Sequence, residues 1–335
     1  MDQDHIKKIL DRITKVKIAV YGDFCLDAYW IVDQKGSEIS IETGLKTEAM
    51  SRHYYTPGGA GNVVANLCAL QPSEIKVIGV IGDDIFGREL NEQLQALGTD
   101  TNSLFVQKNS FETYTYLKRL SGGKEEPRID FGNFNKRSRE TDQKIVYAIE
   151  AALQECDALV FNQQVTGSIT NDAFLTDVNL LFEKYSHKVI VLDSRHYNHR
   201  FQNVCLKANE REILTLAKAD PNAAKNMHDI ETYGKTIFKR YDKPVFVTCG
   251  EQGMIAFDHS GHYKIPAVTV KGELDTVGAG DTVTSAITLC LAAGISVHDA
   301  AWFANLAAAV TVQKLYTTGT ATGEEILEIS SMYKS

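Results

Sequence analysis

The most chemically suggestive stretch of the chain is DTVGAGDT, residues 275–282, which precedes an apolar run of helix length. Small residues at Gly278, Ala279 and Gly280 let the backbone approach a ligand, and free N–H groups at a helix start attract an anion. A carboxylate beside a bound phosphate is costly unless it has a chemical task. We therefore interpret Asp281 as a general base that accepts a proton from a hydroxyl attacking a phosphoryl group, rather than as a helix cap.

Four further loops follow apolar, strand-like segments and carry polar or glycine-rich residues. They are YGDFCLD with Asp23 and Asp27, PGGAGNVVAN with Gly58, Gly59 and Asn62, KANEREI with Asn209 and Glu212, and TCGEQGM with Thr248, Gly250 and Gly253. Turn aspartates and glycines before a helix are common, so the structural interpretation stays open for the first two loops. Asn209 and Glu212 suit either water-mediated contact with Mg²⁺ or an N-cap.

The elements around these loops predict an α/β protein. After residue 141, helix-length amphipathic segments alternate with short apolar segments, which is typical of a parallel sheet covered on both faces. Ligands of such sheets bind beyond the carboxyl ends of the strands, where the polar loops lie. Residues 29–55 have no helical period and predict a small antiparallel excursion. We expect one domain over residues 1–335, with a small β lid from about 28–57 and 110–133.

Composition and charge exclude several classes of function. The chain is 44% hydrophobic and 23% charged, with a net charge of −8, which argues against binding to nucleic acid or to anionic membranes. The six cysteines form no C-x-x-C pair and no apolar stretch is long enough for a membrane span, so we expect a cytoplasmic location. Neither G-x-x-x-x-G-K-[ST] nor a G-x-G-x-x-G after the first strand occurs, which disfavours P-loop enzymes and Rossmann dehydrogenases.

The motifs PGGAGNVVAN, NERE, TCGEQG and DTVGAGDT occur in this order along the chain. Together they resemble the ribokinase-like (PfkB) carbohydrate kinase family over essentially the whole chain, and DTVGAGDT is that family's most specific signature. YGDFCLDAYW and FANLAAAVTVQKLYTTGT are most similar to its heptose 7-phosphate kinase branch, the kinase part of the ADP-heptose synthases. The resemblance implies a three-layer α/β/α sandwich with a mostly parallel central sheet and a β lid. It also implies an ATP-dependent sugar kinase that uses Mg²⁺.

The resemblance also implies a role for each matching residue. Asp281 would activate the sugar hydroxyl while Gly278, Ala279 and Gly280 hold the transferring phosphoryl group. Sugar hydroxyls would be bound by Asp23, Asp27, Gly58, Gly59 and Asn62. Asn209 and Glu212 would position Mg²⁺ and phosphates through water, and Thr248, Gly250, Gly253 and Asn305 would border the ATP. Asp275 and the Val277 carbonyl would belong to a loop for a monovalent cation such as K⁺, and the lid would build a homodimer.

The substrate side departs from the heptose-phosphate branch. That branch usually has D-Y-x-K-G after the strand ending here in ALVFNQQVTG, so Gln163 replaces the acid and Thr166 replaces the lysine. Glu38 stands where an arginine is usual. Other cations expected near the sugar are Arg52, Lys118, Arg119, Arg128 and Arg195. A kinase of a nucleoside or other polyol, and a weakly active relative that binds nucleotide or sugar, remain alternatives.

Overall fold

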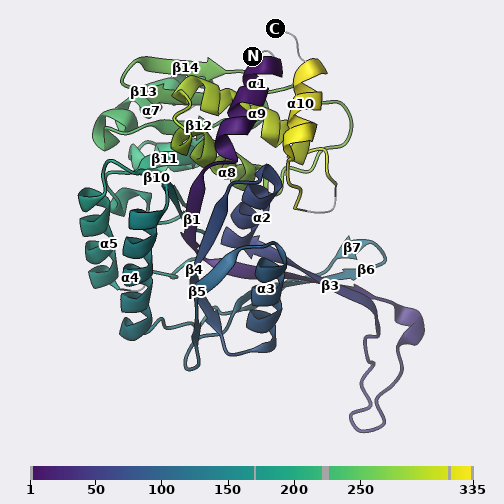
Figure 1. The fold of residues 1–335 in the computed structure, drawn as a ribbon. Helices are drawn as coiled ribbons and strands as arrows, with labels where there is room; N and C mark the ends of the chain where they lie inside the picture. Colours follow the sequence, from purple (N-terminus) through teal and green to yellow (C-terminus); the bar gives the residue numbers. More distant parts are fainter. Residues whose placement is uncertain (1–2, 170, 221–225, 316–317, 333–335) are drawn as a thin grey trace.

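A computed structural model describes residues 3–169, 171–220, 226–315 and 318–332 of the chain. Its centre is a nine-stranded sheet (Figure 1). The strands of this sheet are β1 Lys17–Gly22, β4 Glu74–Gly82, β5 Asp100–Gln107, β9 Ala158–Gln163, β10 Val189–Ser194, β11 Cys205–Asn209, β12 Val245–Thr248, β13 Met254–Asp258 and β14 Gly261–Ile265. Their order is β14-β13-β12-β11-β10-β9-β1-β4-β5. All pairs from β12 to β5 are parallel, whereas β13 and β14 add antiparallel strands at one edge.

Helices cover both faces of this sheet (Figure 1). Residues of α1, α2, α3, α8, α9 and α10 enter one apolar core, and residues of α4, α5, α6 and α7 enter the other. α3 also packs beside β3 and β5. The bounds of the helices are α1 Gln3–Ile13, α2 Ala60–Leu70, α3 Ile85–Ala96, α4 Arg139–Glu155, α5 Asp172–Lys184, α6 Glu210–Leu216, α7 Met227–Tyr241, α8 Ala279–Ala292, α9 Val297–Thr311 and α10 Gly323–Met332. The three-layer α/β arrangement predicted from the sequence is confirmed.

The two cores lie on opposite faces of the central sheet because side chains alternate along each strand. Successive side chains of a strand point to opposite faces, so a strand buried on both sides reads as a continuous apolar run. In β1, Val20 enters the core with α2 and α8, and its neighbour Tyr21 enters the core with α4 and α5. Burying each large apolar side chain stabilises the fold by about 1.5–3 kcal/mol before the opposing entropy.

A second, five-stranded sheet stands beside the first. Its strands are β2 Phe24–Val32, β3 Met50–Gly59, β6 Tyr114–Ser121, β7 Lys124–Glu125 and β8 Ile129–Phe131. β2 pairs with β3 antiparallel, as predicted, but it also pairs with β6 parallel. The parallel pair is possible because α2, β4, α3 and β5 lie between β2 and β6 in the chain and supply the crossover that parallel strands need.

Residues 33–49, between β2 and β3, project away from the rest of the molecule (Figure 1). The antiparallel excursion predicted for residues 29–55 is interrupted here, since residues 37–42 form a single bridge, Ile39 to Lys46, and no strand. Glu38 lies in this segment and is exposed. Within the described part of the chain, no helix is long and apolar enough to cross a membrane.

Candidate active site

The polar loops predicted from the sequence come together at the carboxyl ends of the parallel strands of the central sheet. β1, β10, β11 and β12 are linked to one another through parallel pairs, so their carboxyl ends face the same way. Asp23, Arg195 and Glu210 directly follow the ends of β1, β10 and β11. The second turn of α8 contacts β10 near this end, because Thr284 Oγ1 donates to Asp193 Oδ2 at 2.7 Å.

The start of α8 has the backbone form that the sequence suggested. Gly278 is the N-cap residue with φ +82, a left-handed conformation that favours glycine. A Cβ on Gly278 would stand 2.6 Å from Thr318 Cγ2, so a larger residue would also collide with the segment after α9. Ala279 and Gly280 begin the helix and Asp281 lies in its first turn. N–H groups at this terminus have no partner inside the helix and suit an anion.

The glycine-rich start of α2 meets the start of α8. The Asn62 side chain donates a hydrogen bond to Asp281, which joins two of the predicted motifs. The next residue, Thr282, donates through Oγ1 to Asn66 Oδ1 at 2.7 Å, and one turn after Asp281, Ser285 Oγ donates to the Val63 carbonyl at 3.1 Å. The position of Asp281 is thus fixed by two packed helices.

Two buried charges beside α8 were missed by the sequence analysis. Lys207 Nζ on β11 donates to Asp193 Oδ2 on β10 at 3.0 Å, and both side chains are more than nine-tenths buried. A Cβ on Gly280 would stand 3.1 Å from Lys207 Nζ, so the ammonium group lies against the first turn of α8. The signal that could have identified this pair is a lysine within the otherwise apolar strand CLKA and an aspartate ending VIVLD.

Burial raises the pKa of Asp281 to about 7, and the carboxylate of Asp193 adds to this effect. Lys207, the hydrogen bond from Asn62 and the exposed Arg195 oppose the rise. Burial also works against the charge on Lys207, but the carboxylates of Asp193, Glu212 and Asp281 outweigh it and raise the pKa of the ammonium group. A carboxyl group with a pKa near 7 beside a permanent cation suits proton transfer at neutral pH.

Asn209 and Glu212 form a capping box at the start of α6. Asn209 Oδ1 accepts from the Glu212 N–H at 3.0 Å, and Glu212 Oε2 accepts from the Asn209 N–H at 2.8 Å. The capping alternative left open by the sequence is therefore present. Burial raises the pKa of Glu212 while Lys207 lowers it, which shows that this carboxylate also lies near the buried pair.

The residues predicted to border a nucleotide surround the ends of β12 and β14. Gly250 and Gly253 have φ +53 and +92, and a Cβ on Gly253 would stand 2.5 Å from the Ala267 nitrogen. Thr248 ends β12, and Asn305 of α9 donates to the Ile265 and Pro266 carbonyls at 3.3 and 3.1 Å. Asn305 thus holds the chain after β14 in place.

Asp27 lies on the second sheet, in contact with Lys118. Its Oδ1 is 3.2 Å from Lys118 Nζ on the neighbouring β6. A Cβ on Gly58 of β3 would stand 2.7 Å from Asp27 Oδ2. Gly58, predicted to let the backbone approach a ligand, thus also makes room for this carboxylate. Gly59 has φ +56 and precedes α2.

Two of the other cations predicted near the sugar, Arg128 and Arg119, are paired with acids. Arg128 holds Asp130 at two points, 2.5 and 2.7 Å, and its guanidinium lies 4.3 Å from the centre of the Tyr116 ring. Arg119 contacts Glu48 at 2.8 Å and Glu126 at 3.1 Å. These pairs neutralise much of the positive charge on the second sheet.

Asp23 anchors the loop that follows β9. Its Oδ2 accepts from the N–H groups of Gln164 and Val165, both at 2.8 Å, and from Ser168 Oγ at 2.9 Å. Burial raises the pKa of Asp23 and these hydrogen bonds oppose the rise. A structural role, which the sequence left open, is therefore present for this aspartate.

Of the two substituted positions, Gln163 ends β9 and Thr166 lies on the loop that follows it. Gln163 is buried, and its Oε1 accepts from Ser194 Oγ at 2.8 Å while its Nε2 donates to the Val165 carbonyl. Thr166 is exposed and its hydroxyl lies 3.1 Å from His196 Nε2. Gln163 thus joins the ends of β9 and β10, and Thr166 presents a hydroxyl instead of a charge.

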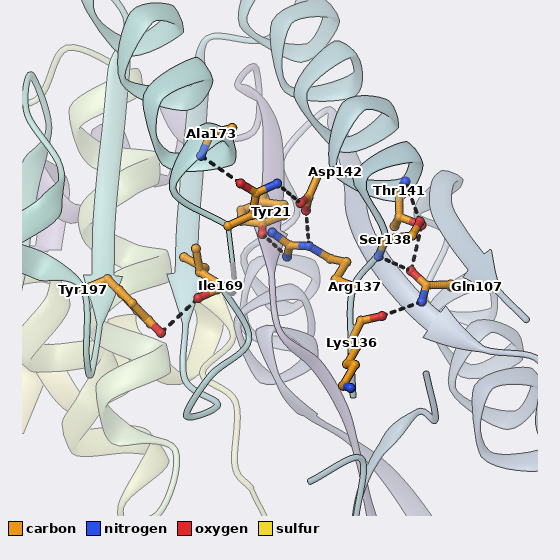
Figure 2. A network of polar contacts seen from close by, with 11 residues as sticks. Tyr21, Gln107, Lys136, Arg137, Ser138, Thr141, Asp142, Ile169, Ala173 and Tyr197 are labelled. Carbon is orange, nitrogen blue, oxygen red and sulfur yellow. Dashed lines mark hydrogen bonds and ion pairs between the residues drawn. The ribbon is translucent and has the colours of Figure 1, made fainter. Parts of the chain in front are cut away.

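A buried ion pair holds the far end of the loop (Figure 2). Arg137 contacts Asp142 at the start of α4 and donates to Tyr21 Oη at 2.9 Å, and Asn171 donates to Asp142 at 3.3 Å. Tyr197 Oη donates to the Ile169 carbonyl at 3.1 Å. The loop is therefore tied to β1, to α4 and to the chain after β10.

Asp275, predicted for a monovalent-cation loop, makes a local turn before α8. Its Oδ1 accepts from the Val277 N–H at 3.0 Å, and its own N–H donates to the Val312 carbonyl at 2.9 Å. Residues 316 and 317 of FANLAAAVTVQKLYTTGT lie outside the described residues. Across the described ranges, no three His, Cys, Asp or Glu side chains gather closely enough to hold a metal ion by themselves.

Comparison with known proteins decides the family. The sequence profile of the pfkB family carbohydrate kinases matches residues 15–322. The chain belongs to this family. The kinase is 30% identical over 316 residues to the bifunctional protein HldE of a Nitratiruptor species, covering 94% of this chain and 65% of that protein. It is 29% identical over 323 residues to HldE of Wolinella succinogenes, and the match covers 96% of this chain and 66% of that protein. The kinase thus spans slightly less than two thirds of these relatives' length.

Solved structures show that the kinase has a ribokinase-like fold. Arabidopsis thaliana ribokinase, solved with ribose and ATP, superposes with a TM-score of 0.71 at 18% identity, covering 94% of this chain and 98% of that one. A putative phosphofructokinase from Staphylococcus aureus superposes with a TM-score of 0.73 at 19% identity, covering 94% of this chain and 96% of that one. The predicted enzyme class, a phosphotransferase of the carbohydrate kinases, is supported by the family match over residues 15–322.

Proposed function

We propose that the kinase transfers the γ-phosphate of ATP to a sugar hydroxyl, with Asp281 as the general base. The observation that carries this proposal is the environment of Asp281, whose carboxyl group has a pKa of about 7 beside Lys207 and the N-terminus of α8. Ribose and ATP in the related plant ribokinase support the choice of substrates.

In this mechanism Asp281 accepts the proton of the attacking hydroxyl, while Asn62 keeps the carboxylate oriented. The N–H groups at Gly278, Ala279 and Gly280 and the ammonium group of Lys207 stabilise the charge on the transferring phosphoryl group. General base catalysis contributes roughly 10²–10⁴-fold. Donors fixed in advance around a developing anion contribute on the order of 10²–10³-fold each.

The residues on the nucleotide side fit ATP and Mg²⁺. The ammonium group of Lys207 offers positive charge to phosphate oxygens. The neighbouring start of α8 offers backbone N–H groups, which a ligand can approach because Gly280 has no side chain. The capping box uses Glu212 Oε2, and we assign its Oε1, with Asn209, to water molecules around Mg²⁺. Bound Mg²⁺ neutralises phosphate charge. The nucleotide is bordered by Thr248, Gly250, Gly253 and Asn305, and K⁺ is the candidate near Asp275 and the Val277 carbonyl.

On the sugar side, the proposed hydroxyl ligands are Asp27 and Asn62, with Asp23, Gly58 and Gly59 shaping the site. Arg128 is also proposed to lie at the substrate, with its positive charge partly neutralised by the ion pair with Asp130. The second sheet, residues 28–57 and 110–133, is proposed as the lid of one kinase domain over residues 1–335. Heptose 7-phosphate is the named candidate substrate, through the resemblance to that branch.

The test is an assay of ADP release on a panel of alcohols, combined with calorimetric binding. The panel contains heptose 7-phosphate, free heptose, fructose, ribose, adenosine and glycerol. Turnover of one sugar supports the proposal. Turnover of adenosine or glycerol alone would make the enzyme a nucleoside or polyol kinase, and binding of ATP or sugar without turnover would make it a binding protein.

A further inference from the structure

The ion pair between Asp27 and Lys118 lies on the face of the second sheet that carries Gly58. The pair is largely closed to water, with 12% of the Asp27 side chain and 19% of the Lys118 side chain exposed. Asp27 Oδ1 faces Lys118 Nζ at 3.2 Å, and Oδ2 lies next to Gly58. One oxygen of the carboxylate is thus held by a cation, and the other adjoins a position without a side chain.

Lys118 is itself held by the sheet. It lies directly across from Tyr29 of β2, donates to Tyr29 Oη at 3.0 Å, and its ammonium group is 4.7 Å from the centre of that ring. Tyr29 in turn stacks on Tyr54 of β3, with ring centres 4.7 Å apart and planes 7° apart. Such cross-strand pairs stabilise a sheet and restrict side-chain rotamers. The cation that contacts Asp27 is therefore fixed before any ligand arrives.

Few other groups offset the cost of a buried charge on Asp27. The titratable and charged groups around it are Cys25 and Tyr29 on β2, Tyr116 and Lys118 on β6, Glu125 on β7, and Arg128 before β8. Burial raises the pKa of Asp27, Lys118 is the largest opposing influence, Arg128 opposes more weakly and Glu125 adds to the rise. Arg128 has its own carboxylate partner in Asp130.

We propose that Lys118 is a positioning residue for sugar binding, which keeps the Asp27 carboxylate charged and oriented so that it accepts hydrogen bonds from sugar hydroxyls. This inference rests on the proposed function, in which Asp27 is a sugar ligand. An ionised carboxylate accepts up to four hydrogen bonds, whereas a protonated one has an O–H donor on one oxygen and accepts fewer. Hydrogen bonds to a charged acceptor are also about twice as strong as neutral ones.

The test compares the sugar KM of variants between about pH 5 and 9, using the sugar of highest kcat/KM in the panel. Lys118→Met removes the ammonium group but keeps an apolar stem against Tyr29. Without Lys118 the pKa of Asp27 rises, so the carboxylate is protonated as the pH falls. We expect the sugar KM to rise about tenfold near pH 6 and less near pH 9. The KM for ATP should not change.

Two variants serve as controls. Lys118→Arg restores a cation and should restore the pH profile of the parent enzyme. Lys124→Met removes an exposed lysine of β7 in the same sheet and should leave the sugar KM unchanged at every pH. If Lys118→Met shows no cooperative melting transition, Lys118→Gln replaces it, since an amide also reaches Tyr29 without carrying charge.

Asp27→Asn separates this inference from the proposed function. It should raise the sugar KM at all pH values, and adding Lys118→Met to it should change nothing further. An increase that is the same at every pH, or none, in Lys118→Met would overturn the role of Lys118 while Asp27 remained a sugar ligand. An unchanged KM in Asp27→Asn would remove Asp27 from the sugar site, and the role of Lys118 would go with it.

Discussion

Asp281 occupies a helix position where an acidic residue is ordinary, yet its surroundings are not those of a surface cap. A carboxylate in a first turn stabilises a helix through the macrodipole when it is exposed to water. Here burial and Asp193 both disfavour the charge on Asp281, and Lys207 and Asn62 only partly restore it. A carboxyl group that is costly to ionise in the folded state has the properties of a base rather than of a stabilising cap.

Asp281→Asn should lower kcat by roughly 10²–10⁴-fold while leaving the dissociation constant for ATP nearly unchanged. Because the folded-state pKa is raised to about 7, the fold loses stability progressively as the pH rises from the unfolded-state pKa of about 4 to that value, and the whole loss persists above it. The variant should therefore melt at the same or a higher temperature at pH 8. Turnover close to that of the parent enzyme would make Asp281 a cap.

The same carboxyl group predicts how activity depends on pH. Asp281 accepts a proton only when ionised, so kcat/KM should fall tenfold per pH unit below about pH 7 and level off above it. Initial rates in buffers of constant ionic strength check this. A profile that stays flat down to about pH 5 would show a carboxyl group with an ordinary pKa, contrary to the burial of this one.

The sequence alone identified some of the candidate active-site residues but not others. Asp281 could be identified because Gly-Ala-Gly before an aspartate has no purpose in a plain helix start. Lys207 and Asp193 could not be paired, because they lie on different strands and meet only through the parallel pairing of β10 with β11. The structural contacts of Asp23 likewise depend on a loop more than 140 residues away.

At the scale of the elements, the short helix α6 begins with a capping box, and its two residues, Asn209 and Glu212, are also the proposed contacts for Mg²⁺. Asn209→Ala removes one side-chain acceptor from the capping box and should lower the free energy of unfolding by about 1 kcal/mol. If Asn209 and Glu212 also position Mg²⁺, the KM for MgATP should rise as well. Urea unfolding and initial rates measure the two effects.

A matched control comes from α4, whose N-cap Ser138 accepts from the Thr141 N–H at 3.1 Å (Figure 2) and is not among the residues proposed to bind the nucleotide. Ser138→Ala should cost a similar free energy of unfolding without changing the KM for MgATP. Equal effects of the two variants on KM would limit Asn209 to capping.

The elements with strong local periodicity were predicted well, and those defined by distant pairing were not. Helices such as α4 and α5 and strands such as β9 and β10 lie where alternating segments indicated them. The antiparallel hairpin of β13 and β14 was not predicted as part of the sheet. The parallel pairing of β2 with β6 has no local signal, since periodicity reports a strand but not its partner.

For the whole molecule, the second sheet leaves apolar surface and a strand edge exposed. β3 is the outer strand of its sheet, and the projecting segment exposes 62% of Ile39, 102% of Ile41 and 70% of Leu45. Exposed edges and apolar patches favour association. We therefore predict a homodimer through residues 29–55, seen by light scattering at micromolar concentration. A double substitution Ile39→Asp and Ile41→Asp should yield monomers, and a dimer that survives it would have its interface elsewhere.

The distribution of charge over the sugar side bears on which sugar is phosphorylated. A sugar phosphate carries about two negative charges, and a site for it supplies cations that are free to bind them. Lys118, Arg128 and Arg119 are each paired with a carboxylate. Thr166 offers a hydroxyl where the heptose-phosphate branch has a lysine. Glu38 is exposed and belongs to residues 33–49, the segment that projects away from the rest of the molecule (Figure 1).

We therefore predict that heptose 7-phosphate is a poorer substrate than an unphosphorylated sugar. Binding a phosphate would require Lys118 or Arg128 to leave its carboxylate, and the freed acid would then repel the ligand. The measurement compares kcat/KM for heptose 7-phosphate with that for free heptose, fructose and ribose under identical salt. A clear preference for the phosphorylated heptose would contradict the prediction. It would show that exposed cations such as Arg195 and Arg52, which lie outside these pairs, supply the positive charge, and Arg195→Gln should then remove that preference.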